Sequence, residues 1–567
     1  FGVAWSLRGR AQRSLADFFV SGRGVPWWLA GTSMVATTFS ADTPLAVTGL
    51  TANFGIAGNW LWWSFLLSGM MTVFFFARLW RRSGVLTDVE LIELRYAGRP
   101  AAFLRGFRAL YLGVLMNCLI LGWVNLAMVK IFAVSLNLSR KEAVVVCLVI
   151  TALYTTISGL WGVLITDFLQ FLLMMAMAIA MAYFAVDAVG GLGALKAKLL
   201  AAEAAGAGQG SLLAFLPSAD SAWMPIGVFL VYIGVNWWAS WYPGAEPGGG
   251  GYVAQRIFCA KDEKHSLLAT LWFNVAHYAL RPWPWILVAL ASVVLYPNLA
   301  DKEAGYVQVM VDHLPASLRG LMLASFLAAY MSTVSTHLNW GASYAINDFY
   351  RRFLRPDASE EHHLRASQAA TLLLMVLAAV VTYYLESIRG AWQLLLMIGA
   401  GTGGVYLLRW YWWRVNAWSE ISAMVAAFFT SLALNSWNPF VGSEQVVFAK
   451  NMLATTAAVT AVWLAVTFLT PPEPTPHLVN FYQRVRPAAL GWRVLLQHAQ
   501  IPSAPSALSS NFRAWALACA VVYFSLFATG KLLLGFWTEG WLLLAGAVAA
   551  GAGLYLDFRR RGWESFG

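Results

Sequence analysis

Long apolar runs separated by short polar segments make up most of this chain. A helix needs about 20 residues to cross the hydrocarbon core, and on that criterion the runs predict about fourteen spans. The predicted spans fall near residues 27–53, 59–80, 104–134, 141–158, 160–188, 222–243, 265–296, 317–346, 365–386, 388–411, 416–438, 447–471, 513–533 and 538–558. Backbone polar groups in lipid must bond within their own segment, so an all-α integral membrane protein is expected.

Helix-breaking residues interrupt two of these spans. Residues 40–44 of the first span combine Asp42 and two hydroxyls with Pro44, and residues 241–251 of the sixth form a Gly/Pro-rich run. Breaks at matching positions in two halves are typical of transporters built from inverted repeats. The breaks therefore predict one repeat of spans 1–5 and a second of spans 6–10, with spans 11–14 peripheral.

The same pattern divides the chain into seven parts. Residues 1–26 are interpreted as a cytoplasmic lead-in, with the end of a truncated N-terminal helix as a further interpretation. The others are the first repeat (27–188), an outer loop (189–221), the second repeat (222–411), spans 11–12 (412–471), a cytoplasmic linker with an amphipathic helix (472–512), and spans 13–14 with a basic cytoplasmic tail (513–567).

Composition and charge support a membrane location. The chain is 59% hydrophobic and 11% charged, outside the range of soluble globular proteins. Most of its 38 Lys and Arg residues fall in the loops of one face, which the positive-inside rule assigns to the cytoplasm. We therefore expect a multi-pass protein of the inner (plasma) membrane with a cytoplasmic C-terminus. The net charge of +11 indicates topology and contact with anionic membrane lipid rather than binding to nucleic acid.

A dense patch of hydroxyls lies within the eighth predicted span. It comprises Ser332, Thr333, Ser335 and Thr336. Hydroxyls in lipid need a partner, and two kinds are open from this segment alone. They could bind a small dehydrated cation, or they could hold neighbouring helices together.

Several motifs occur in a fixed order along the chain. They are ADFFVSGR at 16–23 with WWLAG at 27–31, LTDVELIELR at 86–95, residues 154–159 with TDFLQ at 166–170, QRIFCAK at 255–261, the patch at 325–336 followed by DFYR at 348–351, and GG at 403–404 with RWYWWRVNAW at 409–418. With this ordered set the chain resembles the sodium/solute symporters, which include sodium–glucose and sodium–proline cotransporters. The resemblance implies a LeuT-like fold of five plus five helices.

The resemblance also implies a sodium site between the first and eighth helices of that fold. Carbonyls of the first helix and one carbonyl with two hydroxyls of the eighth bind the ion in that family. Aligned on this sequence, the ligands are Ala36, Phe39, Ala329, Ser332 and Thr333. An unwound turn frees such carbonyls, and sodium prefers neutral oxygens of this kind.

Some members of the family hold a second sodium with an acid in a Thr-Asp pair. The corresponding acid here is Asp167, with Ser335 and Thr336 as partners. An acid inside a span is a functional candidate by default. The structural alternative is that Asp167 is a residue near a helix N-terminus at the cytoplasmic interface.

The substrate region departs from the sugar transporters of the family. Their second helix carries a Tyr-Glu pair that binds sugar hydroxyls, whereas Trp62 occupies the position of the acid here. A monosaccharide is therefore disfavoured. In the sixth helix, the residues at the position of the sugar transporters' gate are of a similar kind but do not match one by one. The gate candidates here are Asn236, Trp237, Trp238, Trp241 and Glu246.

Charged residues inside the spans add further substrate or gate candidates. Asp42 and Thr43 lie at the break in the first span, and Arg281 is a basic residue deep in the seventh. Arg281 needs a partner, which could be Glu246, Asp42 or a carboxylate substrate. A cation or a planar ring could be caged by Trp62, Trp63, Trp237, Trp238 and Trp241, although interfacial packing is the commoner role of tryptophan.

These features predict sodium-coupled symport of a small polar organic solute by alternating access. Proton coupling through Asp42 or Asp167 is an alternative, as is a non-transporting sensor or assembly subunit with the same fold. An enzyme is not expected, because the sequence contains no Ser/His/Asp, Cys/His or metal-spaced cluster. No cofactor and no metal other than the coupling sodium are expected, and a partner protein is left open.

Overall fold

The computed structural model describes residues 23–155, 160–206, 208–219, 221–502 and 507–561. Within these residues the regular structure is helical, and strand-like pairing is limited to isolated bridges. Ten helices in this part of the chain are long and apolar enough to cross a membrane, or eleven if the bent pair α22 and α23 counts as one span. The all-α membrane architecture is confirmed, whereas the number of about fourteen spans stays a prediction.

The helices of the first half run in chain order from α3 to α13. Their bounds are α3 (Trp27–Thr38), α4 (Asp42–Phe54), α5 (Trp60–Trp63), α6 (Leu66–Met71), α7 (Ala77–Ser83), α8 (Leu91–Arg95), α9 (Gly98–Leu110), α10 (Asn117–Leu136), α11 (Arg140–Thr155), α12 (Leu160–Val189) and α13 (Gly191–Ala204). The short turns η2 (Ile56–Asn59), η3 (Thr72–Phe76) and η4 (Tyr111–Met116) join α4 to α5, α6 to α7 and α9 to α10.

The second half begins with the interrupted sixth span. Its helices are α14 (Ile226–Val231), α15 (Trp237–Ala239), α16 (Gly251–Cys259), α17 (Glu263–Val275), α18 (Pro282–Leu295), α19 (Gly305–His313), α20 (Ala316–Ser343), α21 (Glu360–Tyr384), α22 (Ile388–Gly399), α23 (Gly403–Tyr411), α24 (Ala417–Trp437), α25 (Glu444–Leu469), α26 (Thr475–Val485), α27 (Arg493–His498), α28 (Leu508–Leu533) and α29 (Trp537–Arg561). Four further turns are η5 (Tyr232–Asn236), η6 (Ala276–Leu280), η7 (Lys302–Ala304) and η8 (Tyr344–Leu354).

Both helix interruptions expected from the sequence occur in the structure. α3 ends at Thr38 and α4 begins at Asp42, so three residues leave the helix in the first span. In the sixth, α15 is followed by an irregular segment over residues 240–250. Gly244, Gly248 and Gly249 there have φ angles of 84°, 79° and 78°. Residues with a Cβ rarely adopt such angles, so the glycine run makes this path possible.

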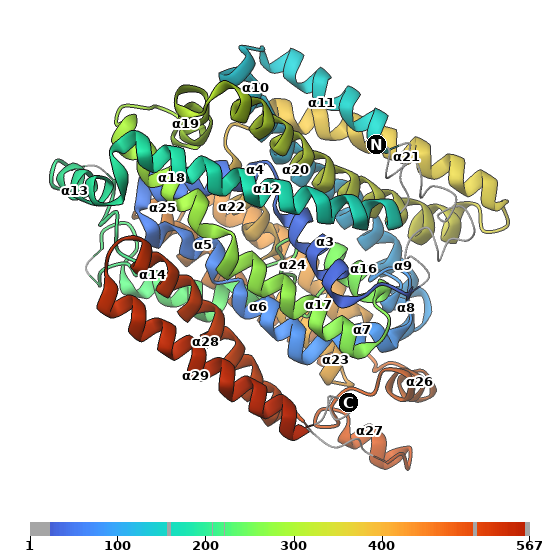
Figure 1. Cartoon of the computed structure of the whole chain (residues 1–567). Coiled ribbons are helices and arrows are strands. Elements are labelled where there is room, and N and C mark those ends of the chain that lie inside the picture. The colour runs from blue at the N-terminus through green and yellow to red at the C-terminus, as the bar shows by residue number, and fades with distance from the viewer. Residues whose placement is uncertain (1–22, 156–159, 207, 220, 503–506, 562–567) are drawn as a thin grey trace.

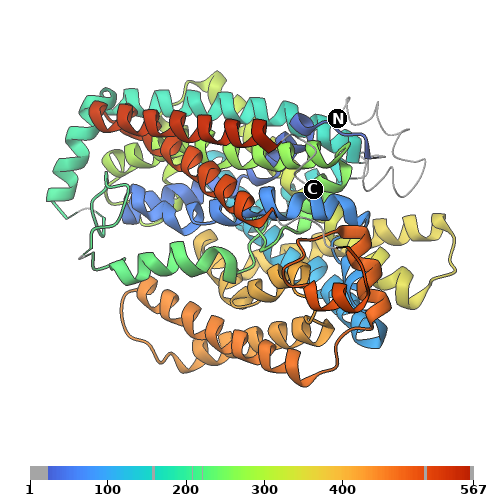
Figure 2. The same cartoon turned by 90° about the horizontal axis from the view of Figure 1, so that it is seen from below.

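The interior of the bundle surrounds the first interruption. α12 packs against α3, α18 and α20, and α20 also packs against α3. The pair α28–α29 lies along the lower edge of the bundle in Figure 1, and the orange pair α24–α25 lies along the lower edge in Figure 2. The most apolar window of residues 56–83 is 89% buried, against 22% for α29. The inner helices therefore contact protein, whereas α29 presents most of its surface outwards, as a lipid-facing helix does.

Short helices mark the two ends of the bundle. α13 lies at one end, and α26 and α27 lie at the other, in both views (Figures 1 and 2). Between these ends, the α3–α4 break lies in the bundle interior, where its residues are buried. This position places the break where a solute and an ion could bind out of contact with either end.

Candidate functional site

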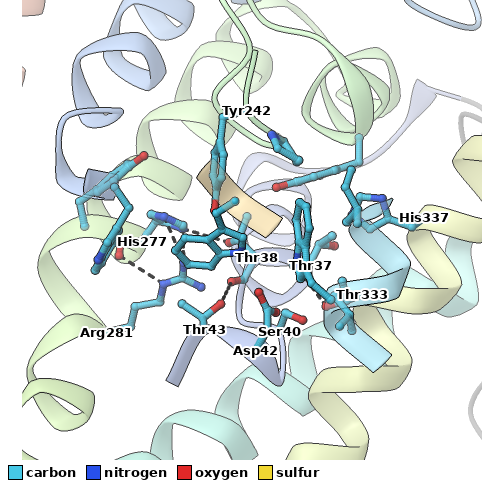
Figure 3. A pocket seen from close by; sticks show the side chains of 18 residues that line it. Thr37, Thr38, Ser40, Asp42, Thr43, Tyr242, His277, Arg281, Thr333 and His337 are labelled. Carbon is cyan, nitrogen blue, oxygen red and sulfur yellow. Dashed lines mark hydrogen bonds between the residues drawn. The ribbon is translucent and has the colours of Figure 1, made fainter. Parts of the chain in front are cut away.

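A small cavity lies against the break between α3 and α4. Its walls come from the break itself, α5, α10, the start of the residue 240–250 segment, α16, η6, α20 and α22. The volume open to water-sized molecules is about 50 Å³, enough for a few waters. Figure 3 shows side chains from these separate elements around one space. Binding sites of interrupted-helix transporters are typically formed in this way.

The carbonyls at the end of α3 are only partly used by the backbone. The Ala36 carbonyl accepts a hydrogen bond from the Phe39 N–H at 3.1 Å. Within the described part of the chain, no donor reaches the Phe39 carbonyl. Buried carbonyls without a donor are uncommon, because the cost of desolvation is then uncompensated. The Phe39 oxygen is therefore available to an external partner.

Hydroxyls of α20 meet this end of α3. Thr333 Oγ1 lies 2.9 Å from the Thr37 carbonyl oxygen and 3.1 Å from the Ala329 carbonyl oxygen, so its single O–H is shared between these two acceptors. Thr333 and Ala329 are both buried. Of the five expected sodium ligands, Thr333 thus contacts the end of α3 through the Thr37 carbonyl, and Phe39 and Ala329 line one small cavity. Ala36 lies in the last turn of α3.

The fifth expected ligand, Ser332, turns toward α12. Its Oγ donates to Asp167 Oδ1 at 2.6 Å, and Ser33 of α3 donates to Asp167 Oδ2 at 2.5 Å. All three side chains are buried. One carboxylate therefore connects α3, α12 and α20 directly beside the Thr333 contact.

Arg256 of α16 completes this polar cluster. Its Nη2 lies 3.9 Å from Asp167 Oδ2, and both side chains are fully buried. The same nitrogen donates to Thr336 Oγ1 at 2.9 Å, while Ser335 Oγ donates to the Ser332 carbonyl at 3.2 Å. Neither Ser335 nor Thr336, the hydroxyl residues expected to bind a second sodium with Asp167, makes a hydrogen bond to Asp167 itself. Arg256 belongs to the QRIFCAK motif, but the motif did not predict that Arg256 would lie beside Asp167 of α12.

Arg281 lines the cavity beside a distorted turn. η6 is a π-helical turn, and its wider winding lets the Arg281 N–H reach the Ala276 carbonyl at 3.3 Å. Pro282 follows and has no N–H to continue the ladder. The fully buried guanidinium contacts the His277 ring and donates to the His277 carbonyl at 3.3 Å. Among the described residues it forms no ion pair with Asp42 or Glu246.

Asp42 begins α4 at the opposite side of the break. Its Oδ1 and the Oγ of Ser40 are buried, and neither has a hydrogen-bond partner among the residues that the structure describes. A carboxylate in the first turn of a helix is favoured by the helix dipole. Thr43 instead donates to the Thr38 carbonyl at 3.2 Å, which holds the break in shape. Asp42 and Ser40 therefore have polar atoms available to a ligand.

Only one of the expected tryptophans lines this cavity. Trp62 does so, with its Nε1 donating to Asn59 Oδ1 at 2.9 Å. Trp237 and Trp238 donate to carbonyls one turn earlier in their own helix. Trp241 lines a separate small cavity beside η4 and α22. The structure thus does not bring the five tryptophans considered as a cage into one site.

The two remaining gate candidates lie along the sixth span outside the cavity. Asn236 donates to Ser64 Oγ at 3.4 Å and accepts from Ser240 at 3.3 Å. Glu246 is buried in the irregular segment, where its Oε2 accepts from the Gly244 N–H at 3.1 Å. Both side chains are thereby engaged within or next to the interruption of this span.

Several cavity residues were not among the sequence candidates. They are Tyr242, Tyr252, His277, Tyr278, His337, Trp123 and Trp392. Tyr242 lies within the recognised Gly/Pro-rich run, so its position next to a break was a usable signal. The others lie on α10, α16, η6, α20 and α22, and their convergence depends on tertiary packing. Figure 3 labels Tyr242, His277 and His337 around the space.

Comparisons with known proteins agree on one family. Residues 18–427 match the model described as "Sodium:solute symporter family", which is well over half of the chain. A "Sodium/glucose cotransporter" of Vibrio parahaemolyticus is 24% identical over 447 residues, covering 75% of this chain and 80% of its own length. "Sodium/glucose cotransporter 1" of Oryctolagus cuniculus is 24% identical over 472 residues, covering 76% and 69%.

A solved structure gives the same fold. The substrate-bound, outward-open state of a Na⁺-coupled sialic acid symporter superposes with a TM-score of 0.67 at 18% sequence identity. The superposition covers 83% of this chain and 95% of that one. The likeness establishes a shared LeuT-like helical architecture, and at this identity it carries no information on the solute.

Proposed function

This chain belongs to the sodium:solute symporter family, and from that premise we propose that it couples inward sodium movement to the uptake of a small polar organic solute. It is a multi-pass membrane protein of a family of transporters rather than enzymes. Sodium is the coupling ion of the family, and in this proposal it is a transported substrate rather than a resident cofactor.

The observation that carries the proposal is the contact between the end of α3 and α20. The Ala36 carbonyl lies in the last turn of α3 and the Phe39 carbonyl, which no donor reaches among the described residues, directly follows it. Thr333 and the Ala329 carbonyl come from α20. We assign sodium to these oxygens, with the Ser332 hydroxyl as a fifth. Neutral oxygens on an unwound turn suit sodium because they replace its hydration shell.

Coupling follows from where the break lies. An ion that bridges α3 and α20 orders the same segment that presents Ser40 and Asp42 to the cavity. Sodium binding would therefore favour the conformation that binds solute, and its loss to the cytoplasm would favour release. A membrane potential contributes roughly 2.3 kcal/mol per charge for each 100 mV.

The proposed transport cycle uses a repeat of five plus five helices. Spans 1–5 and 6–10 would form the two repeats, each opening on an interrupted span, with α24, α25, α28 and α29 peripheral. We propose about fourteen spans and a cytoplasmic C-terminus on the positive-inside distribution. The interruptions at residues 39–41 and 240–250 support this repeat, because they fall at matching positions. Asn236, Trp237, Trp238, Trp241 and Glu246 would then belong to the gate region around the second interruption.

Two further assignments concern the buried acids. Asp167, Ser335 and Thr336 could hold a second sodium after a rearrangement that frees Asp167 from Ser332 and Arg256. Proton coupling is the second candidate function, and the partner-free Oδ1 of Asp42 favours it. A proton-coupled protein would show no preference for sodium over other cations.

Direct binding of ²²Na⁺ to the purified full chain tests the sodium site. We expect saturable binding that unlabelled NaCl displaces and KCl does not, and we expect Ser332→Ala/Thr333→Ala to lose it. Thr529→Ala is the matched control, because Thr529 makes the same kind of hydroxyl-to-carbonyl bond at 2.8 Å on an exposed face of α28. Full binding by the double variant would refute the assignment.

A further inference from the structure

A cationic and an anionic side chain line the solute cavity without forming an ion pair with each other. Arg281 is fully buried and Asp42 is 3% exposed, and both line the cavity. No ion pair joins them, and the hydrogen bonds of Arg281 go to neutral groups, namely the carbonyls of Val35 and His277 and the His277 ring. The cavity is therefore lined by one cationic and one anionic side chain, and neither has an ion-pair partner among the described residues.

Such an arrangement is costly in the absence of a ligand. Removing a charge from water without a partner costs several kcal/mol, and a spanning segment offers little solvent to compensate. Packing alone does not explain why both signs occur on one cavity. A ligand with two opposite charges would satisfy both groups at once.

The polar atoms of the cavity fit the two ends of such a ligand. Within the described part of the chain, no hydrogen-bond partner reaches Asp42 Oδ1 or Ser40 Oγ. Asp42 supplies only acceptors and Ser40 can accept, so both suit an ammonium group. Arg281 supplies only donors, in a planar arrangement that matches a carboxylate. Figure 3 shows Ser40, Asp42 and Arg281 around the same space.

The rest of the wall is aromatic. Trp62 and Tyr278 stack with ring centroids 5.8 Å apart, Tyr242 lies within the second interruption, and Tyr252 lies at the start of α16. Aromatic faces bind the carbon skeleton of a solute and tolerate an adjacent ammonium group. The volume of about 50 Å³ open to water-sized molecules limits the solute to a few heavy atoms unless the cavity opens.

We propose that the transported solute is a small zwitterion with a carboxylate and an ammonium group, as in a neutral amino acid. Arg281 would bind the carboxylate, and Asp42 with Ser40 would bind the ammonium group. A monosaccharide would leave both protein charges without a counter-charge. A monocarboxylate would leave Asp42 without a counter-charge, and an amine would leave Arg281 without one. This inference rests on the proposed sodium symport and names its substrate class.

Thermal melting of the purified full chain in NaCl tests the inference with the twenty standard L-amino acids as probes. We expect at least one neutral amino acid to raise the melting temperature saturably in NaCl and much less in choline chloride. For the best probe, the amide and the N-acetyl derivative each lack one charge. Each should bind roughly 30-fold more weakly or worse, since truncating one partner of a buried charge pair costs at least that much.

Charge-removing variants give the matched test. Arg281→Gln should lose the preference for the amino acid over its amide, and Asp42→Asn should lose the preference over its N-acetyl derivative. Arg281→Lys and Asp42→Glu keep the charges and check that altered binding is not a folding defect. Unchanged preferences in folded Arg281→Gln and Asp42→Asn would overturn the inference.

The effect of sodium on the melting temperature separates a failure of the zwitterion proposal from a failure of the symport proposal. Sodium-specific stabilisation with no response to any of the twenty amino acids would overturn the zwitterion assignment and leave the symport proposal standing. Sodium-dependent binding of a monosaccharide or a monocarboxylate, with no response to an amino acid, would also overturn the zwitterion assignment and leave the symport proposal standing. Loss of the sodium effect itself would count against the symport proposal.

Discussion

At the scale of residues, the sodium assignment depends on which oxygens remain available at the α3 break. The aligned positions Ala36, Phe39, Ala329 and Thr333 came from sequence motifs. In the structure the first two lie at the end of α3 and the last two on α20, and Thr333 joins the two helices through the Thr37 carbonyl. Sequence spacing could not show that Ser332 bonds to Asp167, since residues 165 positions apart meet only through the packing of α12 on α20. Spacing on one helix identifies a shared face but not its neighbour.

Replacing Thr333 by alanine removes a hydroxyl from the contact between α3 and α20. We expect sodium affinity to fall by about tenfold or more, because one neutral ligand is lost and the loss of a single buried hydrogen bond costs about 1–2 kcal/mol. Sodium titration by ²²Na⁺ binding measures the effect. Thr333→Ser keeps the hydroxyl and should remain close to the wild type; equal loss in both variants would assign the effect to packing.

Asp167→Asn leaves Arg256 buried without a counter-charge. Breaking a buried pair costs about 3–5 kcal/mol, so the variant should be clearly less stable than the wild type. The amide can still accept from Ser33 or Ser332, so sodium binding should weaken less than in Ser332→Ala. Thermal melting with and without sodium separates the two effects. A variant as stable as the wild type would show that Asp167 is not charged when paired with Arg256.

At the scale of elements, proline and glycine predicted the interruptions better than apolar patterning predicted the number of spans. Pro44 and the run that includes Gly248 and Gly249 lie next to or within the two breaks. The π-helical turn η6 orients Arg281 toward the cavity, but apart from Pro282 no residue in the sequence predicted this turn. Local backbone chemistry can be read from a sequence, whereas a turn that widens under tertiary packing cannot.

Gly249→Ala tests whether the second interruption needs its glycines. Gly249 has a φ of 78°, and an added Cβ would lie 2.8 Å from Trp80 Nε1. A left-handed conformation costs roughly 1–2 kcal/mol for a residue with a Cβ, and the contact adds to that cost. We expect a lower melting temperature and slower uptake.

Gly227→Ala is the control for this substitution. Gly227 lies in α14 without a positive φ, and an added Cβ there would meet nothing within 4 Å. Alanine should be neutral or slightly stabilising in that helix. If the two variants melt alike, the irregular segment does not depend on the left-handed conformation at Gly249.

At the scale of the whole molecule, ion pairs connect segments distant in sequence at one end of the bundle. Arg105 of α9 bonds to Glu93 of α8 at 2.6 Å and to Asp348 of η8 at 2.6 Å, and Arg352 bonds to Glu93 at 3.1 Å. This cluster ties the end of the α20–η8 helix to α8 and α9. A transporter that alternates access must loosen one end at a time, and we expect this cluster to be part of the cytoplasmic closure.

The Glu93 cluster predicts a pH-dependent contribution to stability. Burial alone would raise the pKa of Glu93, but hydrogen bonds and charges from Arg352 and Arg105 outweigh it and lower the pKa below its ordinary value. The charged form is therefore favoured in the folded state. Its contribution is present above the ordinary pKa of glutamate and is lost as the pH falls through the lowered value.

Comparison of Glu93→Gln with the wild type measures this contribution. Because the cluster is partly exposed, the variant should be less stable by about 1 kcal/mol at pH 7. The difference should shrink toward zero as acid protonates Glu93 in the wild type. Melting at a series of pH values checks this, and a difference that stays constant down to strongly acidic pH would contradict it.

The most direct test of sodium coupling is thermal melting of the purified protein titrated with NaCl, KCl and choline chloride at fixed ionic strength. A folded site between α3 and α20 predicts a saturable rise in melting temperature in NaCl alone, which disappears in Ser332→Ala/Thr333→Ala and persists in Thr529→Ala. Equal melting curves in the three salts would contradict sodium coupling, because the oxygens at the α3 break would then have no preference for sodium.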